Sequence, residues 1–561
     1  MAGGRAGRCR GASPVTASAG TPAPARPDVD VAVVGAGFAG LYLLHRLRGL
    51  GLRVRVLEQG ADVGGTWFWN RYPGARCDIE SVDYCYSFSD DLLAGWTWTE
   101  RYATQPEILR YLHHVADRFD LRRDIQCGTR VTSARYDEPG NRWLVSTDAG
   151  EVISARYCVM AVGCLSSVKR PGFAGLQSFR GEWHHTARWP AGGADFRGRR
   201  VGIVGTGSTA IQALPQIAEQ ADRVQVFQRT PNYSMPAQNR PLPPEELRGI
   251  VRGYRDRRRA AQQSDAGVPV APPQRSALEV TPQQRRRMYE AGWRRGGINA
   301  LSYAFTDFFT DERANFTAQE FAREKIRQIV RDPVVADALC PAHHIGTKRT
   351  CVDIGYFETY NRDHVELVDV RASPITAVTP GGLATTAGEY RLDVIVFAVG
   401  FDAITGALLE MDIRGRDGES LAQNWSRGPR TYLGLCVAGF PNLFMITGPG
   451  SPSVLSNMVV SIEQHVDWIA ECLGYLAGRG MDRIEASAEA EDAWVRHVTE
   501  VADATLYPRA PTAWYVGANI PGKPRVFMPY VGGCGTYREE CDEVVDRGYR
   551  GFVLQTPGKA S

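Results

Sequence analysis

Two glycine-rich turns, each between a strand-like run and a helix-like segment, constrain the fold of this chain most strongly. Residues 35–40 follow the apolar run 29–34, and residues 205–210 follow the run 200–204. Both match G-x-G-x-x-G/A, whose glycines permit a tight turn, close approach to a pyrophosphate and close helix packing. Each turn opens a βαβ unit. The sequence therefore predicts an α/β protein with two Rossmann-like dinucleotide-binding domains.

The composition is that of an ordinary globular protein with two or three domains. The chain has 561 residues, 43% of them hydrophobic, and a net charge of only +3, which predicts no nucleic-acid partner. No run of eighteen apolar residues is present, so no membrane partner is expected. The 12 cysteines are scattered without a C-x-x-C pair, which favours free thiols in a reducing compartment and indicates no metal site. We expect a cytoplasmic monomer.

The first turn is predicted to bind FAD. Gly35, Gly37 and Gly40 form the glycine pattern, and Glu58 ends the next strand, 18 residues after Gly40. A carboxylate at that position accepts hydrogen bonds from ribose hydroxyls and repels a 2′-phosphate, which leaves FAD or NAD. The residues that continue from this strand favour FAD, because a Gly-Gly pair lets the chain pass close to the flavin. The pair is Gly64 and Gly65, and Gly65, Thr66 and Trp67 are predicted to bind the flavin.

The loop of residues 69–78 is dense in aromatic and charged groups. It contains Arg71, Arg76 and Asp78, and we interpret it as an active-site lining rather than only a rigid aromatic core. Tyr84, a few residues later, is also predicted to bind the flavin.

The second turn is predicted to bind NADPH. It comprises Gly205, Thr206, Gly207 and Ser208, and the strand that follows ends without an acid. Arg229 and Thr230 stand there instead. A guanidinium grips a 2′-phosphate bidentately, which favours NADPH over NADH. Lys348 is expected to add a second positive charge at the same phosphate.

The elements along the chain predict that one nucleotide domain interrupts the other. Residues 240–335 read as arginine-rich helices, and the clusters at 255–259 and 285–287 are interpreted as solvated helix faces. The predicted segments are a disordered tail at 1–28, an FAD domain at 29–163 and 400–561, an NADP domain at 164–228 and 347–399, and a helical insertion at 229–346.

The chain resembles the type I Baeyer–Villiger monooxygenases from about residue 29 onward. Residues 179–190, FRGEWHHTARWP, match their pattern Phe179-x-Gly181-x-x-x-His185-x-x-x-Trp189-Pro190, and residues 346–349, 447–453 and 514–524 support the match. The resemblance implies that NADPH reduces the flavin and that dioxygen adds at flavin C4a. The resulting peroxide would attack a ketone to give an ester or lactone.

The resemblance also implies roles for single residues. Arg349 matches the catalytic arginine, Asp78 the acid that pairs with it, and Trp514 a tryptophan near the nicotinamide ribose. A guanidinium keeps its charge and stabilises anionic oxygen, and a buried arginine needs a counter-ion such as Asp78. For His185 we favour a structural role that ties the inter-domain linker to both domains over that of a general base. Cys164 and Cys351 are expected near the substrate cavity.

Two other functions remain open from the sequence. A flavin N- or S-oxygenase would not need Arg349, and residues Trp189 and Pro190 speak against it. A nucleotide-binding redox sensor without turnover is the alternative from another class.

Overall fold

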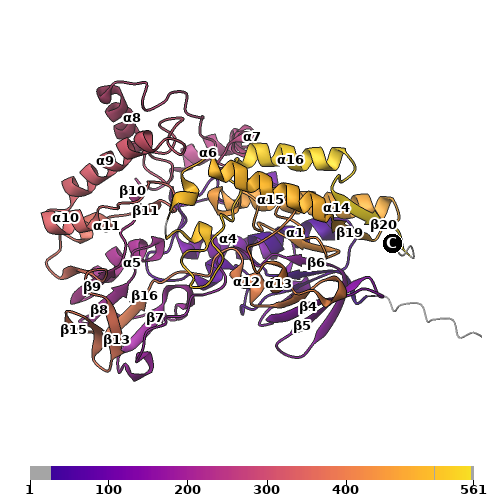
Figure 1. Cartoon of the computed structure of the whole chain (residues 1–561), viewed down its shortest axis with the longest axis horizontal. Coiled ribbons are helices and arrows are strands. Elements are labelled where there is room, and N and C mark those ends of the chain that lie inside the picture. Colours follow the sequence, from indigo (N-terminus) through magenta and orange to yellow (C-terminus); the bar gives the residue numbers. More distant parts are fainter. Residues whose placement is uncertain (1–26, 511, 558–561) are drawn as a thin grey trace, which may run out of the picture.

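The computed structural model describes residues 27–510 and 512–557, and the tail predicted for 1–28 lies outside them except for Pro27 and Asp28. Two separate sheets organise the molecule (Figure 1). The first takes strands from residues 29–160 and again from 412–445, whereas the second takes all its strands from 182–397. The second α/β unit is therefore inserted in the first, as the sequence predicts.

The first sheet has the strand order β17-β4-β5-β6-β1-β2-β3, with β18 also beside β6. Its strands are β1 Val29–Val34, β2 Val54–Leu57, β3 Ile125–Gln126, β4 Val131–Asp137, β5 Arg142–Thr147, β6 Val152–Met160, β17 Asp412–Arg414 and β18 Leu443–Met445. β1 lies between β2 and β6 and runs parallel to both. It reads as a continuous apolar run because both faces of a parallel sheet are covered.

Helices from both ends of the chain cover this sheet. They are α1 Phe38–Gly49, α4 Gln105–Arg118, α14 Met458–Gly478, α15 Ala488–Asp503 and α16 Cys534–Asp546. Figure 1 shows the orange and yellow helices beside the indigo ones. The Tyr42 hydroxyl on α1 donates to Asp467 Oδ1 on α14 at 2.7 Å, which ties the two ends together.

The second sheet is parallel throughout, in the order β12-β9-β8-β16-β7. Its elements are β7 Glu182–His185, β8 Arg200–Val204, α5 Ser208–Ala218, β9 Arg223–Gln228, β12 Val365–Asp369 and β16 Val394–Phe397. An antiparallel sheet of β13 Ile375–Thr379, β14 Gly382–Thr385 and β15 Gly388–Arg391 extends from it. β7 lies in the segment interpreted from the sequence as an inter-domain linker. It is a strand of the second sheet because its backbone pairs with β16.

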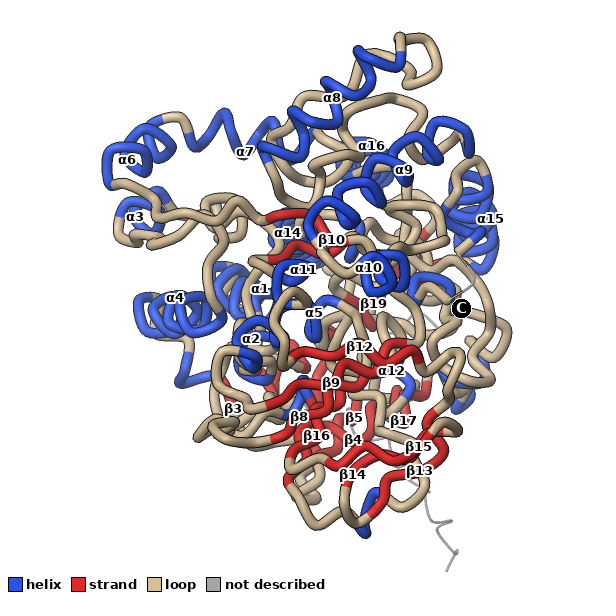
Figure 2. The backbone as a smooth tube through the Cα atoms, turned by 90° about the vertical axis from the view of Figure 1, so that its left-hand side faces the viewer, coloured by secondary structure: helices blue, strands red, loops and turns tan. Residues whose placement is uncertain are grey.

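The arginine-rich segment between β9 and β12 is helical, as predicted. Its elements are β10 Ser234–Pro236, α6 Pro244–Arg252, α7 Tyr254–Gln263, α8 Pro282–Arg295, α9 Glu312–Ile329, α10 Pro333–Leu339, β11 Cys351–Asp353 and α11 Tyr356–Thr359. β10 and β11 form a small parallel sheet, and Figure 2 shows β10 beside α9, away from the larger sheets. Shorter elements elsewhere are α2 Thr66–Trp69, α3 Asp90–Ala94, α12 Gly406–Leu409, α13 Leu421–Asn424, β19 Arg483–Ala486 and β20 Phe552–Gln555. Among the described helices, none is long and apolar enough to cross a membrane.

The prediction that residues 255–259 form a solvated helix face is wrong for two of the arginines. Arg258 is 5% exposed and pairs with Glu463 on α14 at 2.5 Å. Arg257 pairs with Asp83 at 2.6 Å. The charge run does not reveal this, because the carboxylates that pair with these two side chains come from distant segments. The insertion is thus anchored to the first α/β unit by ion pairs.

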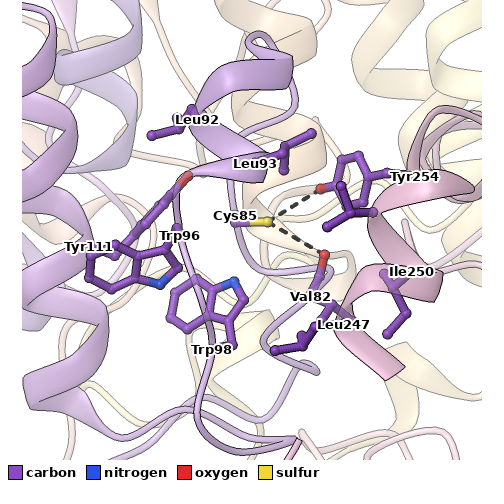
Figure 3. A pocket seen from close by; sticks show the side chains of 11 residues that line it. Val82, Cys85, Leu92, Leu93, Trp96, Trp98, Tyr111, Leu247, Ile250 and Tyr254 are labelled. Carbon is purple, nitrogen blue, oxygen red and sulfur yellow. Dashed lines mark hydrogen bonds between the residues drawn. The ribbon is translucent and has the colours of Figure 1, made fainter. Parts of the chain in front are cut away.

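A small apolar pocket lies at the same contact (Figure 3). It has a volume of about 30 Å³ and lies between the loop with Trp96 and Trp98 and the helices α6 and α7. The Cys85 thiol lies 3.3 Å from the Tyr254 hydroxyl at its edge. No predicted site residue lines it, so it is a packing space between the insertion and the first α/β unit.

Candidate active site

The backbone of the first glycine turn packs so closely against neighbouring backbone that its glycines leave no room for side chains. Gly35 has φ +106°, and a Cβ there would lie 2.5 Å from the Ala161 carbonyl oxygen. A Cβ on Gly40 would lie 1.9 Å from the Gly35 oxygen. A Cβ on Gly37 would meet the Cα of Gly65 at 3.4 Å. The two glycine segments therefore face one another and form a cradle of bare backbone that fits a pyrophosphate.

Glu58 closes one end of this cradle. Its side chain is buried and accepts hydrogen bonds from the amides of Ala36 and Gly60, both at 2.7 Å. Burial raises its pKa, while the two amides oppose that shift. The carboxylate is thus fixed beside the turn, and its remaining lone pairs can accept ribose hydroxyls.

The predicted flavin residues beyond the cradle lie on and beside the short helix α2. Gly65 has φ +50°, and α2 begins at Thr66 directly after it. Trp67 is buried, and its Nε1 donates to the Tyr84 hydroxyl at 3.2 Å. Asp78, which lies between these residues in the sequence, faces Arg349 instead.

Arg349 and Asp78 form a two-pronged ion pair. Arg349 Nε donates to Asp78 Oδ2 and its second terminal nitrogen donates to Oδ1, both at 2.8 Å. The third guanidinium nitrogen donates to the Val454 carbonyl at 2.6 Å. Burial alone would lower the pKa of Arg349, but the Asp78 charge outweighs it and holds the pKa above its usual value. The guanidinium is a permanent, oriented positive charge.

The three charged residues of the loop 69–78 point to different places. Arg76 donates to Glu100 Oε2 at 2.9 Å and to the Tyr102 carbonyl at 2.8 Å. Arg71 donates to the Phe68 carbonyl at 2.9 Å and borders a separate cleft of about 420 Å³ between α4 and residues 190–193. Of the three charged residues, only Asp78 reaches Arg349.

An apolar cluster adjoins the guanidinium on the side of Val454. Its buried members are Cys164, Ala403, Ile404, Val454, Tyr507, Ala510, Ala513, Tyr515, Val516 and Met528. Burial raises the pKa of Tyr515 to about 12, and the Arg349 charge opposes that shift. The Cys164 thiol lies 3.0 Å from the Ser453 hydroxyl, beside Val454. The fixed cation thus lies beside a buried apolar environment, which is the kind of surrounding that suits a neutral organic molecule with one polar oxygen.

Trp514 lies at the border of this cluster, with its ring 4.3 Å from that of Tyr515. The loop that carries it is fastened to the segment after β16. Asn519 Nδ2 donates to the Phe401 carbonyl at 2.8 Å, and Lys523 pairs with Asp402 at 2.5 Å.

The second glycine turn is open on its outer side. Gly205 has φ +114°, and a Cβ there would lie 2.5 Å from the Ala398 oxygen, whereas a Cβ on Gly207 would meet nothing within 4 Å. The Thr206 hydroxyl donates to the Thr230 carbonyl at 2.9 Å, which joins the turn to the end of β9. The geometry fits a ligand lying over the N-terminus of α5.

Three cations gather near the end of β9. Burial lowers the pKa of Lys348, and the nearby charge of Arg229 lowers it further. The same two causes lower the pKa of Lys169, a residue that is not among the predicted cofactor ligands. Only its placement in space reveals it, because no motif contains Lys169. Mutually repelling cations near the carboxyl end of a strand fit a multiply charged anion such as a 2′-phosphate.

His185 uses both ring nitrogens in hydrogen bonds to nearby backbone, as expected of a structural residue. Its Nδ1 accepts from the Ala187 amide at 3.0 Å, so its Nε2 carries the hydrogen and donates to the Lys169 carbonyl at 3.1 Å. Burial lowers its pKa to about 4, which keeps the ring neutral at pH 7. Arg188 stacks over the Trp69 ring at 4.1 Å. This motif therefore connects both α/β units but lies outside the set around Arg349.

Within the described residues, no group of three or more His, Cys, Asp or Glu side chains could hold a metal ion.

Comparison with known proteins gives matches over nearly the whole chain. Residues 32–255 match the family described as pyridine nucleotide-disulphide oxidoreductase. The acetone monooxygenase (methyl acetate-forming) of Gordonia sp. (strain TY-5) is 43% identical over 94% of this chain and 99% of its own. A Baeyer–Villiger monooxygenase of Pseudooceanicola batsensis is 42% identical over 94% and 96%. A phenazine N-monooxygenase of Lysobacter antibioticus is 41% identical over 94% of this chain and 97% of its own.

A solved structure is more similar still. Oxidised steroid monooxygenase bound to NADP superimposes with a TM-score of 0.90 at 54% identity, over 94% of this chain and 99% of that one.

Proposed function

This chain belongs to the Baeyer–Villiger monooxygenases, and from that membership we propose how its own residues insert one oxygen atom of dioxygen beside a ketone carbonyl. The enzyme uses FAD and NADPH, and its product is an ester or lactone. When bound, FAD reduced by NADPH activates dioxygen and so supplies the oxygen atom that is inserted. The residues below bind these molecules, orient them and stabilise charge.

The first cradle holds FAD in this proposal. The backbone of Gly35, Gly37 and Gly65 leaves room for the pyrophosphate, and Glu58 accepts the ribose hydroxyls. Trp67 and Tyr84 flank the ring system. The support is the fit of bare backbone and a fixed carboxylate to this ligand, and the carboxylate would repel an additional phosphate.

The second turn holds NADPH. Gly205, Gly207 and Ser208 receive its pyrophosphate, while Arg229 and Lys348 hold the 2′-phosphate and Thr230 is joined to the turn. Trp514 lies at the border of the apolar cluster and is assigned to the nicotinamide ribose.

The two-pronged pairing of Arg349 with Asp78 beside an apolar cluster is the observation that carries the proposed mechanism. Arg349 stabilises negative charge on oxygen, first on the activated oxidant and then on the ketone oxygen once the carbonyl is attacked. Such a fixed donor contributes about 3–4 kcal/mol in other enzymes. Asp78 orients the guanidinium and compensates its charge. The apolar cluster receives the ketone and excludes water from it.

N-oxygenation is the competing activity, since a relative 41% identical to this chain is a phenazine N-monooxygenase. The test is a panel of linear, aryl, cyclic and steroid ketones beside tertiary amines, sulfides and phenazines, with mass gain of one oxygen atom as the readout. Ester or lactone formation from a ketone at a higher kcat/KM than any heteroatom oxygenation supports the proposal. The reverse order would replace it. A sensor without turnover would consume no NADPH with any substrate.

The domain limits remain those predicted, with FAD domain 29–163 and 400–561, NADP domain 164–228 and 347–399, and insertion 229–346. A monomer in the cytoplasm remains the expectation. Sedimentation of the FAD-loaded enzyme tests whether it is a monomer, and cell fractionation tests its location.

A further inference from the structure

The Cys351 thiol lies between the second glycine turn and the backbone of Arg349. It is 1% exposed, 3.2 Å from the Ser208 hydroxyl and 3.2 Å from Asn232 Nδ2. The same Asn232 nitrogen donates to the Arg349 carbonyl at 3.1 Å. One side-chain network thus joins the first residue of α5 to the residue that carries the guanidinium.

The direction of the hydrogen bonds in this network is determined by Asn232. Its Oδ1 accepts from the Tyr233 amide at 3.0 Å, which fixes the amide so that Nδ2 faces the thiol. Because an NH₂ group can only donate, the sulfur accepts from it. The thiol hydrogen then has two acceptors, the Ser208 oxygen at 3.2 Å and the Arg349 carbonyl at 3.8 Å. The shorter contact assigns it to Ser208.

This direction leaves the hydrogen of the Ser208 hydroxyl free. A serine oxygen that accepts from a thiol can still donate its own hydrogen, and Ser208 stands at the N-terminus of α5, where a pyrophosphate oxygen would accept it. Burial raises the pKa of Cys351 to about 11, so the thiol keeps the hydrogen that it donates.

We propose that Cys351 is a positioning residue that orients the Ser208 hydroxyl toward the pyrophosphate of NADP(H) and links that hydroxyl to the backbone of Arg349. The proposal rests on the assignment of the second turn to NADPH. In this role the protonated thiol accepts one hydrogen bond and donates another. A serine hydroxyl can do the same, whereas Val and Ala cannot.

Calorimetric titration of NADP⁺ into the oxidised, FAD-loaded enzyme tests the proposal without turnover. Cys351→Val retains packing volume and removes the hydrogen bonds, and Cys351→Ala removes both. We expect each of these and Ser208→Ala to raise the Kd about fivefold, since one buried hydrogen bond contributes about 1 kcal/mol. Cys351→Ser should stay within about twofold of the unmodified enzyme.

The double variant Ser208→Ala/Cys351→Val distinguishes a relay from two independent effects. A relay predicts about the same loss as either single variant, whereas independent effects multiply to about 25-fold. Cys158→Ala is the matched control, because Cys158 is a buried thiol of β6 in the first sheet. It should leave the Kd within about twofold. In Cys351→Val and Ser208→Ala, the Kd for NAD⁺ should rise by the same factor as the Kd for NADP⁺, since Ser208 is not assigned to the 2′-phosphate.

Two results separate the relay from the underlying assignment. If Ser208→Ala weakens NADP⁺ binding and neither Cys351→Val nor Cys351→Ala does, the relay is wrong and the turn assignment stands. If Ser208→Ala has no effect, the assignment of Ser208 to the cofactor is wrong and the relay falls with it. Multiplicative losses in the double variant also overturn the relay.

Discussion

Arg349 and Asp78, 271 residues apart in the chain, meet through two parallel hydrogen bonds of 2.8 Å. Their side chains are 23% and 20% exposed. A pair of this geometry holds the guanidinium plane in one orientation, and the bond to Val454 points it along the apolar cluster. The orientation of one charge is therefore decided by two distant segments.

Replacing Arg349 should separate cofactor chemistry from oxygen insertion. In Arg349→Ala the second turn and the first cradle are intact, so NADPH should still reduce the flavin, as followed by stopped-flow absorbance. Ester formation should fall by at least about 100-fold, which corresponds to losing one electrostatic donor of about 3 kcal/mol. Arg76→Ala, which breaks the pair with Glu100, is a control and should retain product formation. Normal ester yield from Arg349→Ala would show that another group stabilises the anion.

Replacing Asp78 should leave the Arg349 charge without compensation. Asp78→Ala removes both acceptors, so we expect slower ester formation and a larger fraction of NADPH converted to hydrogen peroxide, measured by a coupled peroxidase assay. Asp78→Asn retains one acceptor oxygen, so its rate of ester formation and its peroxide yield should lie between those of the unmodified enzyme and Asp78→Ala. Equal coupling efficiency in all three proteins would refute the positioning role.

The cations near β9 should discriminate between the two nicotinamide cofactors. Arg229→Ala removes only the predicted 2′-phosphate contact, so KM for NADPH should rise by about tenfold or more while KM for NADH changes less than about twofold. Lys169→Ala tests whether the third cation contributes in the same way. Equal changes for NADPH and NADH would place Arg229 away from the phosphate.

The anchor of the helical insertion should matter for stability. Arg258→Ala leaves Glu463 buried without its partner, and we expect a loss of about 3–5 kcal/mol in the free energy of unfolding. This loss is measured by urea denaturation, with release of the flavin as the signal of unfolding. Arg259→Ala is the matched control, because its pair with Asp256 is exposed and should change stability by less than about 0.5 kcal/mol. Similar losses in both variants would contradict a buried anchor.

Asp353 should make stability depend on pH. It is 7% exposed and accepts from Ser234 and the Tyr356 amide, and burial raises its pKa from 3.8 to about 6. The folded protein then binds more protons than the unfolded one between these values, so stability falls as pH rises through this window. Relative to the unmodified enzyme, Asp353→Asn should become progressively more stable from pH 4 to 6, by denaturant titration. A stability difference that does not vary with pH would exclude ionisation of Asp353.

The local elements were predictable because they depend on neighbours in the chain. The turns at residues 35–40 and 205–210, with the strands before them, are read from glycine spacing and apolar runs. The same holds for the carboxylate of Glu58 and for the helices between β9 and β12. The resemblance carried by residues 179–190 predicted the family and, with it, the pairing of Arg349 with Asp78.

Tertiary structure alone decided the surroundings of these groups. The sequence predicted neither the burial of Arg258 against Glu463 nor the place of Lys169 among the cations. It also did not reveal that the Cys351 thiol contacts Ser208, 143 residues away. Such contacts depend on how the two α/β units and the insertion pack, and periodicity along a chain carries no information about distances between remote segments. The glycine turns and the residues at the ends of the strands that follow them thus predicted the cofactors, while packing decided which other charges and thiols surround them.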